Sequence, residues 1–339
     1  MTEEILNNHA IILNEYNPNL VRAILGLKIS KRELRELNGN EVLIRMEAAP
    51  CNPSDIAFIR GGYNIKKKLP AVPGFEGAGV VVKTGDNDQS LSGKRVSSFT
   101  QSDADGTWAE YFISKAEDCI VIKDGLNFEQ AASLSINPFT AYGLVEMALN
   151  NNCSAIIQNA GGGQIAAFIR TLADLKGLQT INIVRKEESA NSLKAAGVSH
   201  VLDSSRINFK EELKTLAFQL NATMAFDAVG SEQTGILLQA MPPRAKVVLY
   251  GGLAGGLIGG IEPFDIIFRD KKLIGFNLTE WRSAKSKADF EKISNQLQDW
   301  MIGGVLKSQI QAIFKLDEVV NGLRTYIKSM SAGKILFVP

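Results

Sequence analysis

Residues 154–168 read Ser-Ala-Ile-Ile-Gln-Asn-Ala-Gly-Gly-Gly-Gln-Ile-Ala-Ala-Phe. The apolar run Ser154–Asn159 predicts a buried β-strand, and a helical stretch, Ile165–Lys176, follows three consecutive glycines. Glycines at this position let the backbone turn tightly and approach a pyrophosphate, which then rests on the amides of the helix N-terminus. The motif is not a strict G-x-G-x-x-G, because Ala166 replaces the last glycine, but a small residue there still permits close helix–strand packing. The segment therefore predicts the phosphate loop of a dinucleotide-binding domain.

Strand-like and helical segments continue to alternate after this loop. Short β-rich runs predict further strands at Thr180–Val184, Ser199–Leu202, Met224–Val229, Lys246–Tyr250 and Leu273–Leu278. A helical stretch separates each strand from the next, and parallel neighbours need such a crossover. The alternation predicts an α/β domain over roughly residues 127–272, a Rossmann fold with a doubly wound parallel sheet of six strands.

The two flanks of this domain have a different composition. The first 126 residues contain β-rich runs at Glu41–Ala48, Gly77–Val82 and Lys94–Phe99, joined by loops with several prolines and glycines. This pattern is typical of an irregular, mostly antiparallel region. The tail is expected to rejoin that region through helices and strands at Ala288–Ile302, Gln309–Phe314, Glu318–Met330 and Lys334–Val338. We therefore expect residues 1–126 and 273–339 to form one β-rich domain, with a cleft between it and the inserted domain.

Composition excludes several classes of protein. The chain has 339 residues, of which 45% are apolar and 22% are charged, and its formal net charge is +1. A nucleic-acid partner is therefore not expected, and no apolar run approaches the roughly 18 residues that span a bilayer. The acidic start Met1–Glu4 lacks the layout of a secretory signal, and the three cysteines, Cys51, Cys119 and Cys153, predict reduced thiols in the cytoplasm.

The residues after the second expected strand predict the cofactor. A domain that binds NAD usually has an acid there, roughly 20 residues past the glycines, to hold the ribose hydroxyls. This chain has Arg185 and Lys186 instead. Two cations suit a 2′-phosphate, which an arginine can grip through two hydrogen bonds, so we expect NADPH. The alternative is that Arg185 is a solvated residue at a strand end, and the neighbouring Glu187 leaves this alternative open.

Several short motifs resemble those of the medium-chain dehydrogenase/reductase superfamily along nearly the whole chain. Besides the glycine loop, they are APCNPSD at 49–55, PGFEG at 73–77, NPFTAY at 137–142, DAVG at 227–230 and YGG at 250–252. The resemblance implies a β-rich, partly open GroES-like catalytic domain into which the Rossmann domain is inserted. It also implies an oxidoreductase and, by analogy, a homodimer.

Zinc-dependent members of this superfamily have a cysteine and a histidine where this chain has Asn52 and Phe75. Neither residue is a good ligand for a catalytic zinc. The family's group of four closely spaced structural cysteines is absent from the sequence, and His9 and His200 lie outside every motif. No metal is therefore expected. Without that Lewis acid to polarise an alcohol, an ordinary alcohol dehydrogenase is not expected either.

Within the superfamily the chain most resembles the 2-enoyl thioester reductases, and next the quinone oxidoreductases. The first likeness depends on NPSD at 52–55, RGGY at 60–63, Val184-Arg185, and IFRD at 267–270 leading to GFNL at 275–278. Two residues depart from it, since those reductases usually have tryptophan where Asn277 stands and asparagine where Phe75 stands. The departures leave the acyl-thioester substrate open and do not affect the predicted cofactor.

The resemblance implies roles for particular residues. Tyr63 matches the catalytic tyrosine, whose phenol can hydrogen-bond a developing oxyanion and supply or relay a proton. The alternative for Tyr63 is a loop aromatic that caps the cleft. Asn52 is expected to point into the substrate cleft, and Glu76 to be a buried structural acid. The residues expected at the cofactor are Asn137, Thr140, Gly162, Gly163, Gln164, Ile165, Arg185, Lys186, Tyr250, Gly251, Gly252, Leu253, Phe276, Asn277, Leu278 and Lys334.

Three functions are compatible with the sequence. The first is NADPH-dependent transfer of a hydride to an activated C=C bond of a 2-enoyl thioester or an enone. The second is NADPH:quinone reduction. The third is a cofactor-binding protein with little turnover, because a nucleotide site needs only the Rossmann domain.

Overall fold

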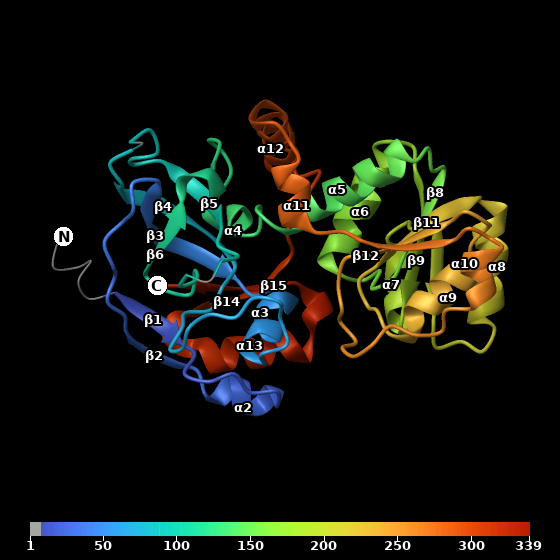
Figure 1. The fold of residues 1–339 in the computed structure, drawn as a ribbon, viewed down its shortest axis with the longest axis horizontal. Helices are drawn as coiled ribbons and strands as arrows, with labels where there is room; N and C mark the ends of the chain where they lie inside the picture. The colour runs from blue at the N-terminus through green and yellow to red at the C-terminus, as the bar shows by residue number, and fades with distance from the viewer. Residues whose placement is uncertain (1–7, 88, 103) are drawn as a thin grey trace. The chain divides into compact units, whose positions relative to one another are not determined.

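The structure of the chain, a computed structural model, describes residues 8–87, 89–102 and 104–339 (Figure 1). The chain divides into two units: unit 1 comprises Met1–Pro138 and Glu291–Pro339, and unit 2 comprises Phe139–Phe290. Both junctions lie further along the chain than the expected 126/127 and 272/273. The short helix α4 (Phe128–Ala131) packs on strands of unit 1, and the strand β13 (Lys272–Gly275) pairs within the sheet of unit 2.

Unit 2 contains the parallel sheet that the sequence predicts. Its six strands run in the order β10-β9-β8-β11-β12-β13, and every pair is parallel. This order is the doubly wound arrangement, with its reversal between β8 and β11, where ligands bind beyond the carboxyl ends of the strands. The strands other than β13 are β8 (Ala155–Gln158), β9 (Gln179–Val184), β10 (His200–Asp203), β11 (Ala222–Asp227) and β12 (Lys246–Leu249).

Helices alternate with these strands and cover the sheet (Figure 1). The central strand β8 is buried along its whole length, as is typical of a parallel strand with helices on both faces. The core includes Ile157, Ile183, Leu213 and Leu237, which come from two strands and from the adjacent helices α8 and α9. The helices are α5 (Asn137–Asn150), α6 (Gln164–Asp174), α7 (Glu187–Ala195), α8 (Phe209–Gln219), α9 (Glu232–Ala240), α10 (Pro263–Ile267) and α11 (Leu278–Ser283).

The last strand of this sheet is shorter than expected. A strand was predicted over Leu273–Leu278, but β13 ends at Gly275 and α11 begins at Leu278. Asn277 is the N-cap of that helix, and its side chain accepts hydrogen bonds from the backbone amides of Thr279 and Glu280. A side-chain acceptor at this position starts a helix, which explains why the strand stops.

Unit 1 is built around a mostly antiparallel sheet of seven strands. The order is β14-β15-β3-β4-β5-β7, and β6 pairs with β3. The C-terminal strand β15 pairs with β3 through Leu336 and Phe337, so the expected return of the tail to the N-terminal region is confirmed. The strands are β3 (Glu41–Pro50), β4 (Glu76–Thr84), β5 (Arg95–Phe99), β6 (Tyr111–Lys115), β7 (Cys119–Val121), β14 (Ile310–Lys315) and β15 (Lys334–Val338), and β1 (His9–Ile12) and β2 (Lys28–Lys31) form a separate pair.

Aromatic side chains fill the core of unit 1. Phe58, Phe75 and Trp108 are fully buried. Trp108 lies 5.0 Å from the ring of Phe337, and its indole nitrogen donates to the carbonyl of Pro50 at 3.1 Å. These contacts join β15 to β3. In the described part of unit 1 the other α-helices are α2 (Leu20–Leu25), α3 (Pro53–Ile59) and α13 (Val319–Lys328), while α12 (Lys287–Ile302) begins before the second junction. Among the described residues, no helix is long and apolar enough to cross a bilayer.

Candidate active site

The glycine loop lies between β8 and α6, as predicted. The amide of Gly161 donates to the carbonyl of Ile183 at 2.8 Å, which ties the loop to the neighbouring strand β9. A Cβ atom at Gly161 would lie 3.0 Å from that carbonyl oxygen, whereas one at Gly162 would meet nothing within 4 Å. Gly163 is the N-cap of α6. The loop is thus held closely on its inner side and is open at Gly162, at the start of a helix, where a pyrophosphate can be accepted.

The two predicted phosphate-binding cations lie at the same edge of the sheet. Arg185 directly follows β9, Lys186 is the N-cap residue of α7, and both side chains are exposed. Because β8 and β9 are parallel neighbours, their carboxyl ends and the loops that follow them meet at one edge. Neither cation forms an ion pair among the described residues. Their charges are therefore available to an anionic group.

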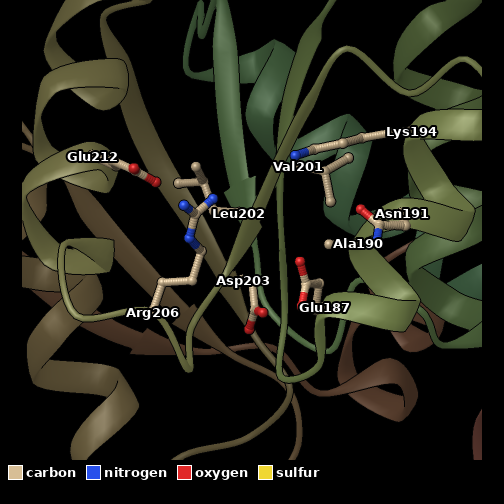
Figure 2. A pocket seen from close by; sticks show the side chains of 9 residues that line it. All are labelled: Glu187, Ala190, Asn191, Lys194, Val201, Leu202, Asp203, Arg206 and Glu212. Carbon is tan, nitrogen blue, oxygen red and sulfur yellow. The ribbon is translucent and has the colours of Figure 1, made fainter.

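Glu187 is the acid whose presence beside Arg185 left the choice between NADPH and NADH open. It lines a hollow of about 270 Å³ between α7, β10 and α8 (Figure 2). Three acids and two cations line it, together with four uncharged residues: Glu187, Asp203, Glu212, Lys194, Arg206, Ala190, Asn191, Val201 and Leu202. Arg185 and Lys186 are not among them. An acidic lining does not suit a phosphate, so we do not assign this hollow to the cofactor.

A buried carboxylate organises the loops after β11 and β12. Asp227 ends β11, is fully buried, and accepts from the side chains of Asn159 and Thr234 at 2.5 and 2.7 Å and from two backbone amides at 2.9 Å. Its own carbonyl accepts from the amide of Tyr250 at 3.0 Å. Asp227 thereby holds the predicted cofactor segment Tyr250–Leu253 at the carboxyl edge of the sheet. In the sequence, Asp227 stood out only as part of the DAVG motif, and this role was not predicted, although an Asn and an Asp at the ends of two expected strands point to it.

The other predicted cofactor residues of this region lie around α5 and α11. Asn137 and Thr140 are both in the first turn of α5, are nearly buried, and fall on opposite sides of the junction between the units. Phe276 packs on α5, where a Cβ atom at Gly143 would lie 2.6 Å from its ring. Asn277 is exposed, and its side-chain oxygen caps α11. It therefore offers no aromatic surface at the position where the enoyl thioester reductases usually have tryptophan.

Tyr63 lies against an aromatic wall in unit 1. Its ring centroid is 5.1 Å from that of Phe75, and its hydroxyl oxygen accepts a hydrogen bond from the side-chain amide of Gln101. Burial, together with the charge of Asp55, raises the pKa of Tyr63 to about 12, and the hydrogen bond from Gln101 opposes this shift. Tyr63 is therefore a protonated phenol at neutral pH. It can donate a hydrogen bond and, to a strong enough base, a proton.

A buried polar cluster adjoins this wall. Asn52 caps α3 and is only 2% exposed; its amide nitrogen donates to Glu76 Oε1 at 2.8 Å, and its amide oxygen accepts from Lys334 Nζ. Glu76 Oε2 accepts from the backbone amide of Ile136 at 3.0 Å. Asn52 is thus part of an internal network, not an open wall of a cleft, and Lys334 is buried and directed at Asn52. Glu76 is buried as expected.

Burial changes the ionisation of this cluster. It raises the pKa of Glu76 to about 6, although Lys334 and Asn52 oppose the shift. It lowers the pKa of Lys334, an effect that the nearby Glu76 charge opposes most strongly. Asp55, at the start of α3, is also fully buried, and burial raises its pKa to about 7. A water-poor environment disfavours every charged form, so burial raises the pKa of the two carboxyls and lowers that of the Lys334 ammonium.

The two positions at which zinc-dependent enzymes have zinc ligands are occupied here by an asparagine and a phenylalanine that do other work in the structure. Asn52 is engaged as described, and Phe75 is a fully buried core residue. No group of three or more His, Cys, Asp or Glu side chains within the described part of the chain could hold a metal ion. His9 lies 3.2 Å from Glu110 on the surface, and His200 begins β10, so neither belongs to this site.

Family models and known proteins match this chain in both units. Residues 38–124 match the family model of the alcohol dehydrogenase GroES-like domain, and residues 165–297 match that of zinc-binding dehydrogenases. The mitochondrial enoyl-[acyl-carrier-protein] reductase of Bos taurus is 31% identical over 289 residues, which cover 83% of this chain and 76% of that protein. The chain belongs to the medium-chain dehydrogenase/reductase superfamily.

Solved structures of the superfamily have the same fold. A candidate NADPH:quinone reductase from Mesorhizobium loti superposes with a TM-score of 0.92 at 29% identity, covering 98% of this chain and 99% of that chain. A mitochondrial 2-enoyl thioester reductase heterodimer from Candida tropicalis gives a TM-score of 0.79 at 22% identity, covering 98% and 100%. The resemblance read from the motifs and the predicted Rossmann and GroES-like architecture are therefore confirmed.

Proposed function

We propose that the chain is an NADPH-dependent reductase that delivers a hydride to an activated C=C bond, in an enone or a 2-enoyl thioester. The observation that carries this proposal is Tyr63, a phenol that is protonated at neutral pH and lies on Phe75, where zinc-dependent relatives have a metal ligand. Among the curated proteins, relatives such as the bovine enoyl-[acyl-carrier-protein] reductase also support it.

The residues of unit 2 suit the cofactor. The open loop at Gly162 and the helix start at Gly163 would take the pyrophosphate, Arg185 and Lys186 the 2′-phosphate, and Tyr250–Leu253 would line the groove. When bound, NADPH supplies the hydride. The protein's part is to hold the substrate carbonyl and provide the proton: Tyr63 would hydrogen-bond the oxygen that becomes negative and protonate the α-carbon.

Quinone reduction is the second candidate. It is favoured by the Mesorhizobium loti protein, which matches 98% of this chain with a higher TM-score than the Candida tropicalis heterodimer. Quinone reduction makes less use of a positioned acid, because a quinone oxygen takes its proton readily from water. A cofactor-binding protein with little turnover is the third reading, and the Asp227-centred loops of unit 2 would serve it equally well.

A turnover screen separates these functions. We expect the purified protein to oxidise NADPH with crotonyl-CoA or an alkenal, and to do so faster than with a naphthoquinone. The measurement is the loss of NADPH absorbance, with product analysis by mass spectrometry. Faster turnover of the naphthoquinone would favour the second candidate, and tight NADPH binding without turnover of any of the three would favour the third.

We expect the protein to need no zinc. Asn52 and Phe75 cannot provide the usual ligands, and the side chain of Asn52 is already engaged by hydrogen bonds with Glu76 and Lys334. Elemental analysis should therefore show well under one zinc per chain, and incubation with a chelator should leave activity unchanged. About one tightly bound zinc per chain, with activity lost on chelation, would contradict this.

The homodimer and the cytoplasmic location also stay proposals. An edge strand and apolar side chains support self-association: β13 ends the sheet of unit 2, and Phe264, Ile267 and Phe268 are 61%, 65% and 76% exposed on and after α10. Exposed apolar surface of this kind is typical of protein interfaces. Light scattering tests whether the protein is a dimer. Imaging of the tagged protein tests whether it is cytoplasmic or, like the relatives named as mitochondrial, lies in mitochondria.

A further inference from the structure

Two amide side chains lie buried next to each other in the parallel sheet of unit 2. Gln158 of β8 and Asn182 of β9 are both 0% exposed, and the register of the two strands pairs them. Strands with helices on both faces are normally apolar, and a polar group buried in one needs hydrogen-bond partners. Gln158 Nε2 donates to Asn182 Oδ1 at 2.6 Å and to the carbonyl of Ala166, in the first turn of α6, at 3.1 Å. The pair therefore connects both strands to the helix that follows the glycine loop.

Arg170 extends this network to the glycine loop itself. It lies in the second turn of α6, and long side chains on a helix lean toward the helix N-terminus. Its Nη1 donates to the carbonyl of Gly161 at 2.5 Å and to Asn182 Oδ1 at 3.3 Å. The amide of Gly161 donates to the carbonyl of Ile183, so both backbone groups of this buried glycine are held.

The direction of the Gly161 carbonyl fixes the direction of the next amide. Gly161 and Gly162 are joined by a trans peptide, whose C=O and N–H point to opposite sides. Because the carbonyl is turned toward Arg170, the amide of Gly162 is turned away from it. Gly162 is exposed, and its amide has no acceptor among the described residues. This N–H is therefore available to a ligand at the point where the loop is open.

The conformation of the loop needs such support. Ala160 has a φ of 50°, in the left-handed region that a residue with a Cβ atom rarely adopts. A strained backbone of this kind persists where the surrounding structure holds it. Inside the loop, the amide of Gly163 donates to the carbonyl of Ala160 at 2.8 Å, while Ile183 and Arg170 hold Gly161 from outside. Arg170 thus stabilises a turn that local preferences do not favour.

Arg170 also brings a positive charge to this end of α6. No acid forms an ion pair with it in the part of the chain that the structure describes. Its charge adds to the partial positive charge of the helix N-terminus, and both favour an anion at the loop.

We propose that Arg170 is a positioning residue for the cofactor, because it holds the Gly161 carbonyl so that the Gly162 amide faces the pyrophosphate. This inference rests on the assignment of the glycine loop to the pyrophosphate of NADPH. NADPH and NADH share that group, so Arg170 contributes equally to the binding of both. Arg185 differs, since it acts on the 2′-phosphate that only NADPH has.

Arg170→Met tests this, because methionine keeps an unbranched side chain and cannot donate a hydrogen bond. ADP-ribose, which has the pyrophosphate and no 2′-phosphate, should bind with a Kd raised roughly tenfold or more. The Kd of NADPH should rise by the same factor, and that of adenosine 2′-monophosphate, which has no pyrophosphate, should stay close to the wild-type value. Arg185→Ala should give the reverse pattern for the two fragments. Isothermal titration calorimetry at one salt concentration measures all of these constants.

Three further variants provide the controls. Lys176→Met removes an exposed cation just beyond the end of α6 and should change none of the constants. Arg170→Lys keeps a charged donor and should restore most of the affinity for ADP-ribose. Arg170→Ala covers the case in which Arg170→Met does not fold, because alanine favours a helix and needs no space. It should weaken ADP-ribose as methionine does.

A second measurement needs no cofactor. Hydrogen exchange followed by mass spectrometry should show the amides of residues 159–164 exchanging faster in Arg170→Met than in the wild type, and at the wild-type rate in Lys176→Met. An unchanged Kd for ADP-ribose in the methionine and alanine variants, or an equal loss of adenosine 2′-monophosphate binding, would overturn the inference. If the wild type binds neither ADP-ribose nor NADPH, the cofactor assignment fails with it. If both bind and no enone or thioester is reduced, only the proposed function fails.

Discussion

Replacing Arg185 with alanine is expected to remove most of the preference for NADPH over NADH. The first two residues after β9 are not acids but Arg185 and Lys186, which are exposed at the edge of the sheet where the glycine loop opens. A hydrogen bond to a charged group contributes about 1.5–3 kcal/mol. One or two such contacts, partly screened by solvent, give a preference of roughly 10- to 1,000-fold at about 1.4 kcal/mol per decade. Steady-state kinetics should show a steep rise in KM for NADPH and almost unchanged kinetics with NADH.

Two further variants sharpen this prediction. Lys186→Ala should have a smaller effect, because an ammonium cannot form the two parallel hydrogen bonds of a guanidinium. Arg206→Ala is the matched control: Arg206 is also an exposed arginine beyond the neighbouring strand, but it lines the hollow in Figure 2. Arg206→Ala should leave the KM for NADPH and the KM for NADH unchanged. The preference should also shrink as salt rises. Equal use of NADPH and NADH by the wild type would show that Arg185 is only a solvated residue.

Tyr63→Phe is expected to lower kcat for C=C reduction by roughly 10²–10³, because a hydrogen bond to a developing charge contributes on the order of 2–4 kcal/mol. The affinity for NADPH should stay nearly the same, since every predicted phosphate contact lies in unit 2. Phenylalanine keeps the ring that packs on Phe75 and removes only the hydroxyl to which Gln101 donates. The measurement is single-turnover reduction of an enone together with direct titration of NADPH.

Tyr16→Phe provides the comparison for structural damage. The hydroxyl of Tyr16 donates to the carbonyl of Lys67 at 3.0 Å and accepts from the amide of that residue at 2.7 Å. Its loss should lower the melting temperature and leave kcat close to that of the wild type. An undiminished kcat in Tyr63→Phe would make Tyr63 a lining residue and would favour quinone reduction as the function.

Local chemistry made much of unit 2 predictable. A strand, a run of glycines and a helix are read from neighbouring residues, because apolar periodicity and glycine's small size act over a few positions. The position of the two cations after β9 is equally predictable from neighbouring residues, since it depends only on where the strand ends. The sixth strand was overextended because Asn277, which looked like a strand residue, instead caps a helix.

The sequence alone therefore determined the family, the doubly wound sheet, the glycine loop between its first strand and the following helix, and the pair of cations to which we assign the choice of cofactor. Only the tertiary structure joined Asn52, Glu76 and Lys334, which come from three separate segments, into one buried network. It also showed that Glu187 lines a hollow to which Arg185 does not contribute, and that Asp55 lies buried with one oxygen that has no partner among the described residues. Burial and charge coupling depend on which distant segments pack together, and no local pattern encodes how much water is excluded from a given side chain.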